Sequence, residues 1–466
     1  MQPKDYFKNK KITMLGLGLL GRGVNVAKFL AENGAQLIIT DIKTKEQLKS
    51  SLKKLKKFGN ITYVLGKHRL KDFSAKGEPA SGGHGPGLVI KAAGVPLDSP
   101  FIKEAQKNKI PVEMDASLFA RLACLCVPAR RQAPTGVTIV GITGTRGKTT
   151  VTNLIYEILK CAWKRVFLGG NIRGIATLPL LKKVRAGDIV VLELDSWQLQ
   201  GFGDAKISPH VAVFTNFMRD HMNYYRGDMD RYFRDKANIF KYQKNGDILV
   251  LGKDVAEKIK QRKLNIKSNI LITDGNIVPK KWKVKILGTH NRENIALAMK
   301  ACRALSIDEK AIKWGVENFK GVPGRLELIR VVGGVRYYND TTATTPDGNR
   351  VALKALSAKK RNIILIAGGN DKELVFDEMA RNINQTVKAL ALIKGTATDK
   401  ILKLLPSKKN YPMVVTGNMK DAVQFAHMYA RRGDTVLLSP GAASFGIFKN
   451  EYDRGDQFVK IVKKIK

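Results

Sequence analysis

The sequence is poor in cysteine and contains no long apolar run. Its four cysteines, Cys124, Cys126, Cys161 and Cys302, lack the paired spacing of zinc ligands and are too scattered for a disulfide framework. No run of about eighteen apolar residues is present, and the first residues form no apolar signal core. We therefore expect no membrane span, no secretory signal and a reducing, cytoplasmic location.

Acidic residues are also few: 40 Asp and Glu stand against 82 Lys and Arg, which gives a formal net charge of +42. Such a charge favours anionic substrates. The basic residues are spread along the whole chain without interleaved aromatics, so we expect no specific nucleic acid partner. A nucleic-acid-binding ATPase remains the second class of function. The 466 residues, 44% of them hydrophobic, predict about three folded domains. We expect a monomer, although length and composition do not determine the oligomeric state.

The central motif is a glycine-rich turn, TGTRGKTT, at residues 143–150, which follows a β-branched apolar run at residues 137–142. Gly144 and Gly147 allow a tight turn whose N–H groups approach phosphate oxygens, and a helix from Lys148 directs its positive end at them. Lys148 suits terminal phosphates and Thr149 suits Mg²⁺. Ile142 stands where the general pattern has its first glycine, so an ordinary strand–turn–helix corner is the alternative interpretation.

A second glycine turn opens the chain. Gly16, Gly18 and Gly21 follow a short strand, and a second strand at residues 36–40 ends at Asp41. In a dinucleotide-binding protein this acid would bind ribose and the turn would bind a pyrophosphate. Since a triphosphate loop is present elsewhere in the chain, a UDP-sugar pyrophosphate is the better ligand.

Other predicted strands end in polar residues. The apolar strand at residues 188–192 leads into Glu193, and a buried carboxylate there is best explained by Mg²⁺. After residue 335, strands at 336–339, 362–367, 390–393, 413–415 and 435–438 alternate with helical stretches and predict a parallel sheet covered on both faces. Ligands bind beyond the C-terminal ends of such strands.

Three stretches carry little information about function. Residues 76–87 are rich in turn formers and predict a surface loop, in which His84 is solvent-exposed rather than functional. Residues 126–136 predict a connection between domains. The lysine-rich residues 253–285 predict no particular element.

Residues 143–150 closely resemble the nucleotide loop of the Mur ligase family, ATP-dependent enzymes that add amino acids to the UDP-muramoyl precursor of the bacterial cell wall, although Arg146 replaces the usual asparagine. Further segments are similar to family motifs in the same order along the chain. They are residues 11–21, 88–96, 168–174, 193–199, 219–225, 287–299, 321–327, 340–344, 368–372 and 439–444.

The resemblance implies an ATP site with two Mg²⁺ ions. Its nucleotide-binding residues are Gly144, Thr145, Arg146, Gly147, Lys148, Thr149, Thr150, Asn291, Asn294, Arg325 and Asp340. Its metal ligands are Thr149, Glu193, His221 and Lys236, the lysine having taken up CO₂ as a carbamate. Judged from the residues alone, Lys236 is an ordinary solvated helix residue, and Asn291 and Asn294 are caps at a helix N-terminus. The implied catalytic residues are Lys148, His221, Lys236 and Asp340.

The resemblance also implies sites for two substrates. The UDP-linked substrate would contact Leu19, Leu20, Gly21, Asp41, Asn171, Ser196 and Gln198. The last three C-terminal motifs resemble the D-glutamate-adding branch, in which Thr344, Lys372 and Ser444 would bind the amino acid's carboxylates. Asn171 is equally a polar turn cap. Thr342 replaces a usual lysine and Glu451 a frequent phenylalanine, so the identity and chirality of the amino acid stay open.

The expected protein is of the α/β class with three domains. Residues 1–118 would form a Rossmann-like domain for the UDP-substrate, residues 119–321 a central ATP-binding domain, and residues 322–466 a Rossmann-like amino-acid-binding domain. The implied reaction joins D-glutamate to UDP-N-acetylmuramoyl-L-alanine through an acyl phosphate formed with ATP. The alternative is another ligase of this superfamily, which adds L-glutamate or a different amino acid or is of the folyl-polyglutamate type.

Overall fold

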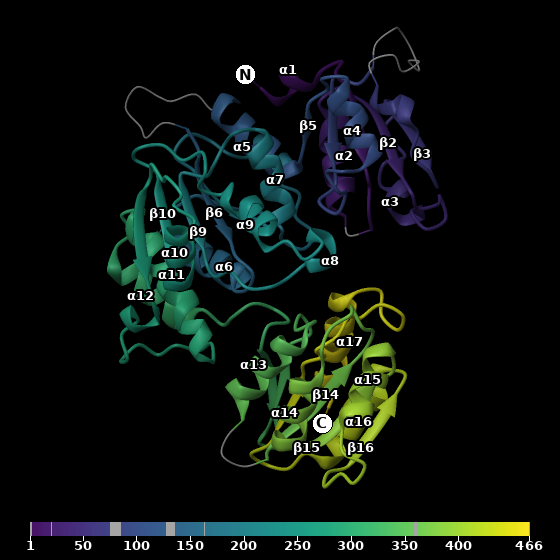
Figure 1. The fold of residues 1–466 in the computed structure, drawn as a ribbon, viewed down its shortest axis with the longest axis vertical. Helices are drawn as coiled ribbons and strands as arrows, with labels where there is room; N and C mark the ends of the chain where they lie inside the picture. Colours follow the sequence, from purple (N-terminus) through teal and green to yellow (C-terminus); the bar gives the residue numbers. More distant parts are fainter. Residues whose placement is uncertain are drawn as a thin grey trace. The chain divides into compact units, whose positions relative to one another are not determined.

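A computed structural model describes residues 2–19, 21–74, 85–126, 136–162, 164–357 and 361–465. The contacts between residues group the chain into two units (Figure 1). The first comprises residues 1–280 and 293–316, and the second comprises residues 281–292 and 317–466. Leu20, His84 and most of the predicted loop 76–87 and connection 126–136 lie outside the described residues.

The first unit begins with a five-stranded parallel sheet in the order β3-β2-β1-β4-β5. Its strands are β1 (Lys11–Leu15), β2 (Gln36–Asp41), β3 (Ile61–Leu65), β4 (Leu88–Lys91) and β5 (Val112–Glu113). Its helices are α1 (Pro3–Phe7), α2 (Arg22–Glu32), α3 (Lys49–Lys53), η1 (Leu70–Phe73), α4 (Pro100–Lys107) and α5 (Asp115–Cys126). Successive residues of β1 enter cores on opposite faces of the sheet: Met14 packs with α2, while Leu15 packs with α4.

The first unit continues with a six-stranded parallel sheet in the order β11-β10-β9-β6-β8-β7. Its strands are β6 (Thr138–Thr143), β7 (Val166–Gly170), β8 (Ile189–Glu193), β9 (Val211–Phe214), β10 (Ile248–Gly252) and β11 (Asn269–Thr273). Its helices are α6 (Lys148–Cys161), η2 (Leu178–Lys182), α7 (Ser196–Asp204), α8 (Met222–Tyr225), α9 (Met229–Ala237), α10 (Lys253–Gln261) and η3 (Gly275–Ile277). Then follow α11 (Thr289–Ala304) and α12 (Glu309–Asn318), of which residues 293–304 and 309–316 belong to this unit.

The position of β6 determines where a ligand can bind. This strand lies between β8 and β9, so the ends of three parallel strands surround the glycine loop that follows it. The predicted strand, turn and helix at residues 137–159 are confirmed, with α6 beginning at Lys148. The lysine-rich stretch 253–285 contains α10, β11 and η3, which its composition did not reveal.

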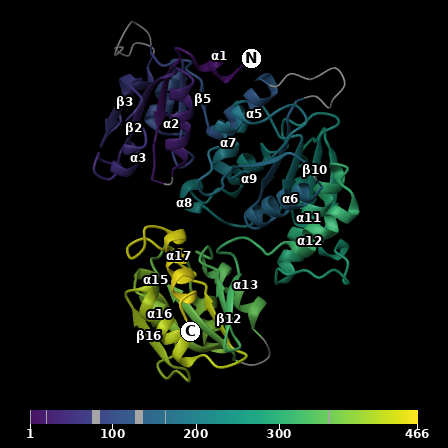
Figure 2. The same ribbon diagram turned by 180° about the vertical axis from the view of Figure 1, so that it is seen from behind.

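The second unit contains a six-stranded sheet in the order β12-β13-β17-β14-β15-β16. Its strands are β12 (Glu327–Val332), β13 (Val335–Asn339), β14 (Ile363–Gly368), β15 (Val387–Ile393), β16 (Met413–Thr416) and β17 (Thr435–Leu438). Helices α13 (Pro346–Leu356), α14 (Asp377–Thr386) and α15 (Thr396–Leu404) cover one face, and α16 (Met419–Tyr429) and α17 (Glu451–Val462) cover the other. Figure 2 shows the same sheet from behind.

One strand of this sheet was not predicted. The five predicted strands are present and mutually parallel, but β12 pairs antiparallel with β13 at the edge. The two strands are joined by Gly333 and Gly334, whose φ angles are +55° and +77°. A pair of glycines between short strands is a hairpin signal, and it was present in the sequence. Among the described residues, no helix is long and apolar enough to cross a membrane.

Candidate active site

The glycine loop has no room for side chains at its two glycine bends. Gly144 has φ +145°, and a Cβ there would lie 1.9 Å from Thr215 Oγ1. Gly147 has φ +81°, and a Cβ there would lie 2.2 Å from Asn294 Oδ1. Both positions therefore require glycine for conformation and for space. The backbone between them forms a narrow cradle at the N-terminus of α6, which fits a phosphate group.

The strand end beside the loop holds it in place. Thr215 Oγ1 donates to Arg146 O at 2.5 Å, and the Arg146 N–H donates to Asn216 Oδ1 at 2.9 Å. Thr145 Oγ1 donates to Met218 O at 3.1 Å. Thr215 and Asn216 directly follow β9, so the order of strands in the sheet brings them to the loop. Sequence reasoning missed both residues, because only the pairing of β6 with β9 makes them neighbours of the loop.

Two lysines lie against the loop's carbonyl groups. Lys148 Nζ donates to Gly144 O at 3.1 Å and to Thr145 O at 3.2 Å. Lys236 Nζ, on α9, donates to Gly144 O at 2.8 Å and to Thr143 Oγ1 at 3.4 Å. Lys236 is only 1% exposed, so its interpretation as a solvated helix residue is wrong. Burial, followed by the charge of Lys148, holds the pKa of Lys236 well below its usual value.

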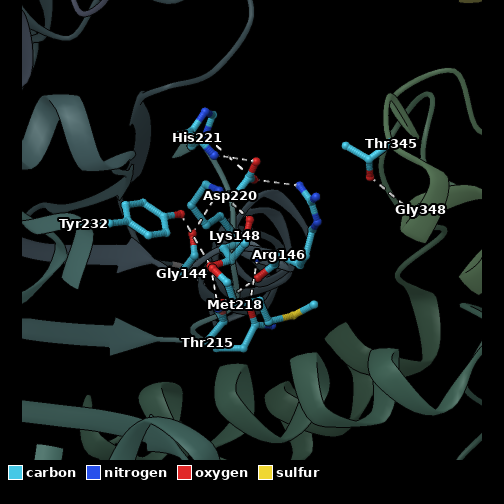
Figure 3. Close-up of polar contacts among 12 residues, drawn as sticks. Gly144, Arg146, Lys148, Thr215, Met218, Asp220, His221, Tyr232, Thr345 and Gly348 are labelled. Carbon is cyan, nitrogen blue, oxygen red and sulfur yellow. Dashed lines mark hydrogen bonds and ion pairs between the residues drawn. The ribbon is translucent and has the colours of Figure 1, made fainter. Parts of the chain in front are cut away.

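His221 and Asp220 approach the same loop, as Figure 3 shows. Asp220 Oδ2 lies 3.1 Å from Arg146 Nη1 and 3.8 Å from His221 Nε2. Burial raises the pKa of Asp220, but Arg146 and His221 outweigh it and the pKa is lowered. Burial lowers the pKa of His221, with help from Lys148. This shift favours the neutral form of the imidazole, which is the form that ligates metals.

Asp220 is absent from the predicted residues, although it directly precedes His221 in a family motif. Its ion pair with Arg146 gives a reason for the departure at position 146, where the resemblance has an asparagine. An aspartate one residue before a predicted metal ligand was the available signal. The ring of Trp197 packs against that of His221, with 4.7 Å between the ring centroids.

Glu193 ends β8 and is 3% exposed. Its carbonyl oxygen accepts a hydrogen bond from the Asn171 N–H at 2.6 Å, so the turn with Asn171 lies against this strand end. Asp195 caps α7: its Oδ1 accepts from Gln198 N at 2.7 Å, and Gln198 Oε1 accepts from Asp195 N at 3.3 Å. Ser196 and Gln198 are both 2% exposed.

The first glycine turn is organised by Asp41. Its Oδ2 accepts hydrogen bonds from the N–H groups of Leu17 at 2.9 Å and Gly18 at 3.0 Å. Gly21 has φ +86° and caps α2, while Leu19 is 56% exposed. The side chain of Asp41 thus supports the turn from within and is 3% exposed.

In the second unit, Asp340 lies at the end of β13 and accepts from Ser439 Oγ at 2.9 Å and from Leu326 N at 3.1 Å. Burial raises the pKa of Asp340 to about 7. Ser444 is 4% exposed, and its Oγ has no hydrogen-bond partner among the described residues. Lys372 is exposed and Thr344 is half-buried.

Further nucleotide candidates are distributed along the chain. Thr149 and Thr150 lie in the first turn of α6, and Asn294 on α11 faces Gly147. Arg325 lies in the turn before β12, and Asn291 Nδ2 donates to Leu287 O at 2.6 Å in the second unit. Among the described residues, no group of three or more His, Cys, Asp and Glu side chains is arranged to hold a metal.

Three sheets with flanking helices, and a glycine loop between a buried strand and a helix, define the class: an α/β protein with a loop of the kind that suits phosphate. Residues 142–276 match the model of the Mur ligase middle domain, and residues 324–441 match that of the Mur ligase glutamate ligase domain. The chain belongs to the Mur ligase family.

Full-length relatives are named UDP-N-acetylmuramoylalanine–D-glutamate ligase. One from Borreliella afzelii is 35% identical over 98% of both chains, and one from Roseiflexus sp. is 36% identical over 97% of this chain and 98% of its own. One from Clostridium kluyveri is 33% identical over 98% of both chains.

Solved structures of the family share the fold. The UDP-N-acetylmuramate-alanine ligase from Thermotoga maritima has a TM-score of 0.60 and 20% identity, covering 98% of this chain and 100% of its own. The MurF ligase from Thermotoga maritima in complex with ADP has a TM-score of 0.58 and 18% identity, covering 99% of this chain and 96% of its own. The expected α/β class and family are confirmed.

Proposed function

We propose that this protein joins D-glutamate to UDP-N-acetylmuramoyl-L-alanine with ATP, a step of peptidoglycan precursor synthesis. The observation that supports this most strongly is the similarity, over 97–98% of the chain, to relatives that carry this activity in their names. In the proposed reaction the substrate carboxylate attacks the γ-phosphate of ATP, giving an acyl phosphate and ADP. The amine of glutamate then displaces inorganic phosphate and forms the amide.

The glycine loop is the proposed triphosphate site. Gly144 and Gly147 leave space that a Cβ would fill, and α6 begins directly behind them. Lys148 Nζ donates to the carbonyls of Gly144 and Thr145. When ATP is bound, this ammonium would donate to a terminal phosphate instead. Arg146, held by Asp220, and Asn294, which faces Gly147, complete the nucleotide site on this unit.

Thr149, Glu193, His221 and Lys236 are the proposed ligands of two Mg²⁺ ions. The neutral His221 fits a metal, whereas an ammonium on Lys236 does not. Lys236 fits as a carbamate, because a lowered pKa increases the share of neutral amine, the form that can add to CO₂ with loss of a proton. Magnesium would neutralise charge on the transferred phosphate.

The remaining assignments concern the two substrates and the domains. Asp41, Leu19, Gly21, Asn171, Ser196 and Gln198 are proposed to bind the UDP-linked substrate, and Thr344, Lys372 and Ser444 the amino acid's carboxylates. Asp340 and Arg325 are proposed to contact ATP. We retain the proposed domain limits of 1–118, 119–321 and 322–466.

The test is phosphate release with ATP, UDP-N-acetylmuramoyl-L-alanine and a panel of amino acids that includes both enantiomers of glutamate. We expect release only with D-glutamate, and a dipeptide product by mass spectrometry. Release with L-glutamate or another amino acid would assign the chain to another member of the superfamily. Stimulation by DNA or RNA in place of the UDP-substrate would contradict ligase activity.

A further inference from the structure

Helix α2 is hydrogen-bonded to a turn of the six-stranded sheet through its first residue, Arg22. The guanidinium donates from Nε to Ile175 O at 3.3 Å, and from Nη2 to Asn171 Oδ1 at 3.1 Å and Ile172 O at 3.4 Å. These partners lie about 150 residues further along the chain. All three acceptors are neutral oxygens, so the positive charge of Arg22 is not cancelled by them.

The backbone at Arg22 packs directly against the first glycine turn. It directly follows Gly21, which has φ +86°. A Cβ on Gly23 would lie 2.1 Å from Leu17 O, so the start of α2 packs directly on the turn. The N–H of Leu17 is in turn bonded to Asp41. The guanidinium is therefore attached to the turn proposed to bind the UDP end.

Asn171 is fixed in the same way to the end of β8. Its N–H donates to Glu193 O at 2.6 Å, and a Cβ on the preceding Gly170 would lie 2.0 Å from that same oxygen. Two hydrogen bonds thus connect Arg22, which directly follows the glycine turn in the chain, through Asn171 to Glu193, a proposed metal ligand.

The contact with Arg22 determines the orientation of the Asn171 amide. A guanidinium has donors only, so the atom it contacts must be the carbonyl oxygen Oδ1. The Nδ2 group, with its two donors, consequently points away from Arg22, and Asn171 is exposed. An amide presented in this way is suited to a ligand rich in acceptor oxygens, such as a nucleotide-linked sugar.

We propose that Arg22 is a positioning residue for the UDP-linked substrate: it fixes Asn171 so that Nδ2 donates to an acceptor oxygen of that substrate. Arg22 also keeps Asn171 at a fixed place relative to the turn that binds the nucleotide end. This inference rests on the proposed function, since it needs a UDP-linked substrate in this site.

A purely structural role for Arg22 predicts a different result, and the same helix provides the control. Glu32, near the other end of α2, accepts from Lys182 Nζ at 2.8 Å. This ion pair joins α2 to η2 without contacting Asn171. If Arg22 served only to hold the sheets together, loss of either contact would have similar consequences.

The experiment measures binding of UDP-N-acetylmuramoyl-L-alanine by calorimetry, together with steady-state kinetics, for the full-length protein. For Arg22→Ala we expect a Kd and KM for this substrate raised roughly tenfold, as for loss of a charged hydrogen bond. At saturation, kcat should stay within about twofold and the KM for ATP should not change. Arg22→Lys should recover part of the affinity.

Two more variants separate the orientation of the Asn171 amide from the attachment of α2 to the six-stranded sheet. Asn171→Asp still accepts from Arg22 but lacks the Nδ2 donors, so we expect it to bind the substrate roughly tenfold more weakly. Glu32→Gln should bind within about twofold of the wild type. Thermal unfolding identifies any variant that fails to fold, in which case Arg22→Lys and Asn171→Asp still decide the question.

Unchanged affinity in Arg22→Ala, or equal loss in Glu32→Gln, would overturn the inference while leaving the proposed function intact. Failure of the wild type to bind the UDP-substrate would overturn the proposed function, and the inference with it.

Discussion

Lys236 Nζ donates to the carbonyl oxygen of Gly144 at 2.8 Å across a separation of 92 residues in sequence. This contact brings α9 against the glycine loop and places a buried lysine beside Lys148. Burial lowers the pKa of Lys236, and the positive charge of Lys148, whose Nζ shares the same acceptor, lowers it further. The chemistry proposed for Lys236 follows from this arrangement.

Replacement of Lys236 by alanine should remove most of the activity, because the proposed carbamate anion would be lost. Short carboxylic acids such as formate or acetate should restore part of it by supplying an anion in the vacated space. Wild-type activity should depend on bicarbonate after CO₂ is removed. The measurement is phosphate release with and without each acid.

The exposed Lys241, five residues further on, is the control for this experiment. Lys241→Ala should keep full activity and should not respond to added acids. A Lys236→Ala variant with wild-type activity in CO₂-free buffer would contradict the carbamate.

Lys148→Ala should lower kcat by about 10²–10³, since one preorganised charge is lost from the phosphoryl transfer step. Binding of the UDP-substrate, measured by calorimetry without ATP, should stay largely unchanged because Lys148 is proposed to serve only ATP. Lys160→Ala changes an exposed lysine at the other end of α6 and should have no effect. Parallel loss of UDP-substrate binding would mean that the sites are assigned wrongly.

Gly147→Ala tests the space in the loop. A methyl group at this position would lie 2.2 Å from Asn294 Oδ1, so the loop or Asn294 must move. Gly227→Ala is the matched control, because Gly227 has the same φ of +81° and a Cβ added there would meet nothing within 4 Å. Both changes should cost about 1–2 kcal/mol of stability from backbone strain. Only Gly147→Ala should raise the KM for ATP, by roughly tenfold or more. An equal rise of this KM in both variants would contradict the tight fit of Gly147 against Asn294.

Asp340 should make stability depend on pH. Its pKa is raised from 3.8 to about 7 in the folded protein, so the folded state binds the proton more tightly than the unfolded state does. This group's contribution to the free energy of unfolding is complete below about pH 4 and is lost as the pH rises to about 7. A shift of this size corresponds to at most about 4 kcal/mol.

Asp340→Asn removes that titration and should flatten the curve between these limits, as measured by urea unfolding of the variant and the wild type. Asparagine can still accept from Ser439 Oγ through its carbonyl oxygen, whereas its NH₂ group cannot accept from Leu326 N, and that loss lowers stability equally at every pH. An identical pH dependence in both proteins would show that Asp340 is ionised throughout the range.

The elements around the ATP loop could be predicted because their signals are local. The apolar run at residues 137–142, the glycines at 144 and 147 and the helical period after Lys148 lie within one window of sequence. Backbone conformation and amphipathic pattern act over a few residues, so sequence alone determined this strand, turn and helix. The five parallel strands after residue 335 were predicted for the same reason, while the edge strand β12 was missed despite its glycine pair.

Tertiary structure alone decided which distant residues meet. The pairing of Arg146 with Asp220, the contact of Lys236 with Gly144 and that of Arg22 with Asn171 join residues between 74 and 149 positions apart. Such contacts depend on the order of strands and on burial, which no local pattern encodes. The sequence by itself therefore determined the loop and the position of Lys148 at the start of the helix that follows it. The burial that lowers the pKa of Lys236 arises only when α9 packs against the end of β6.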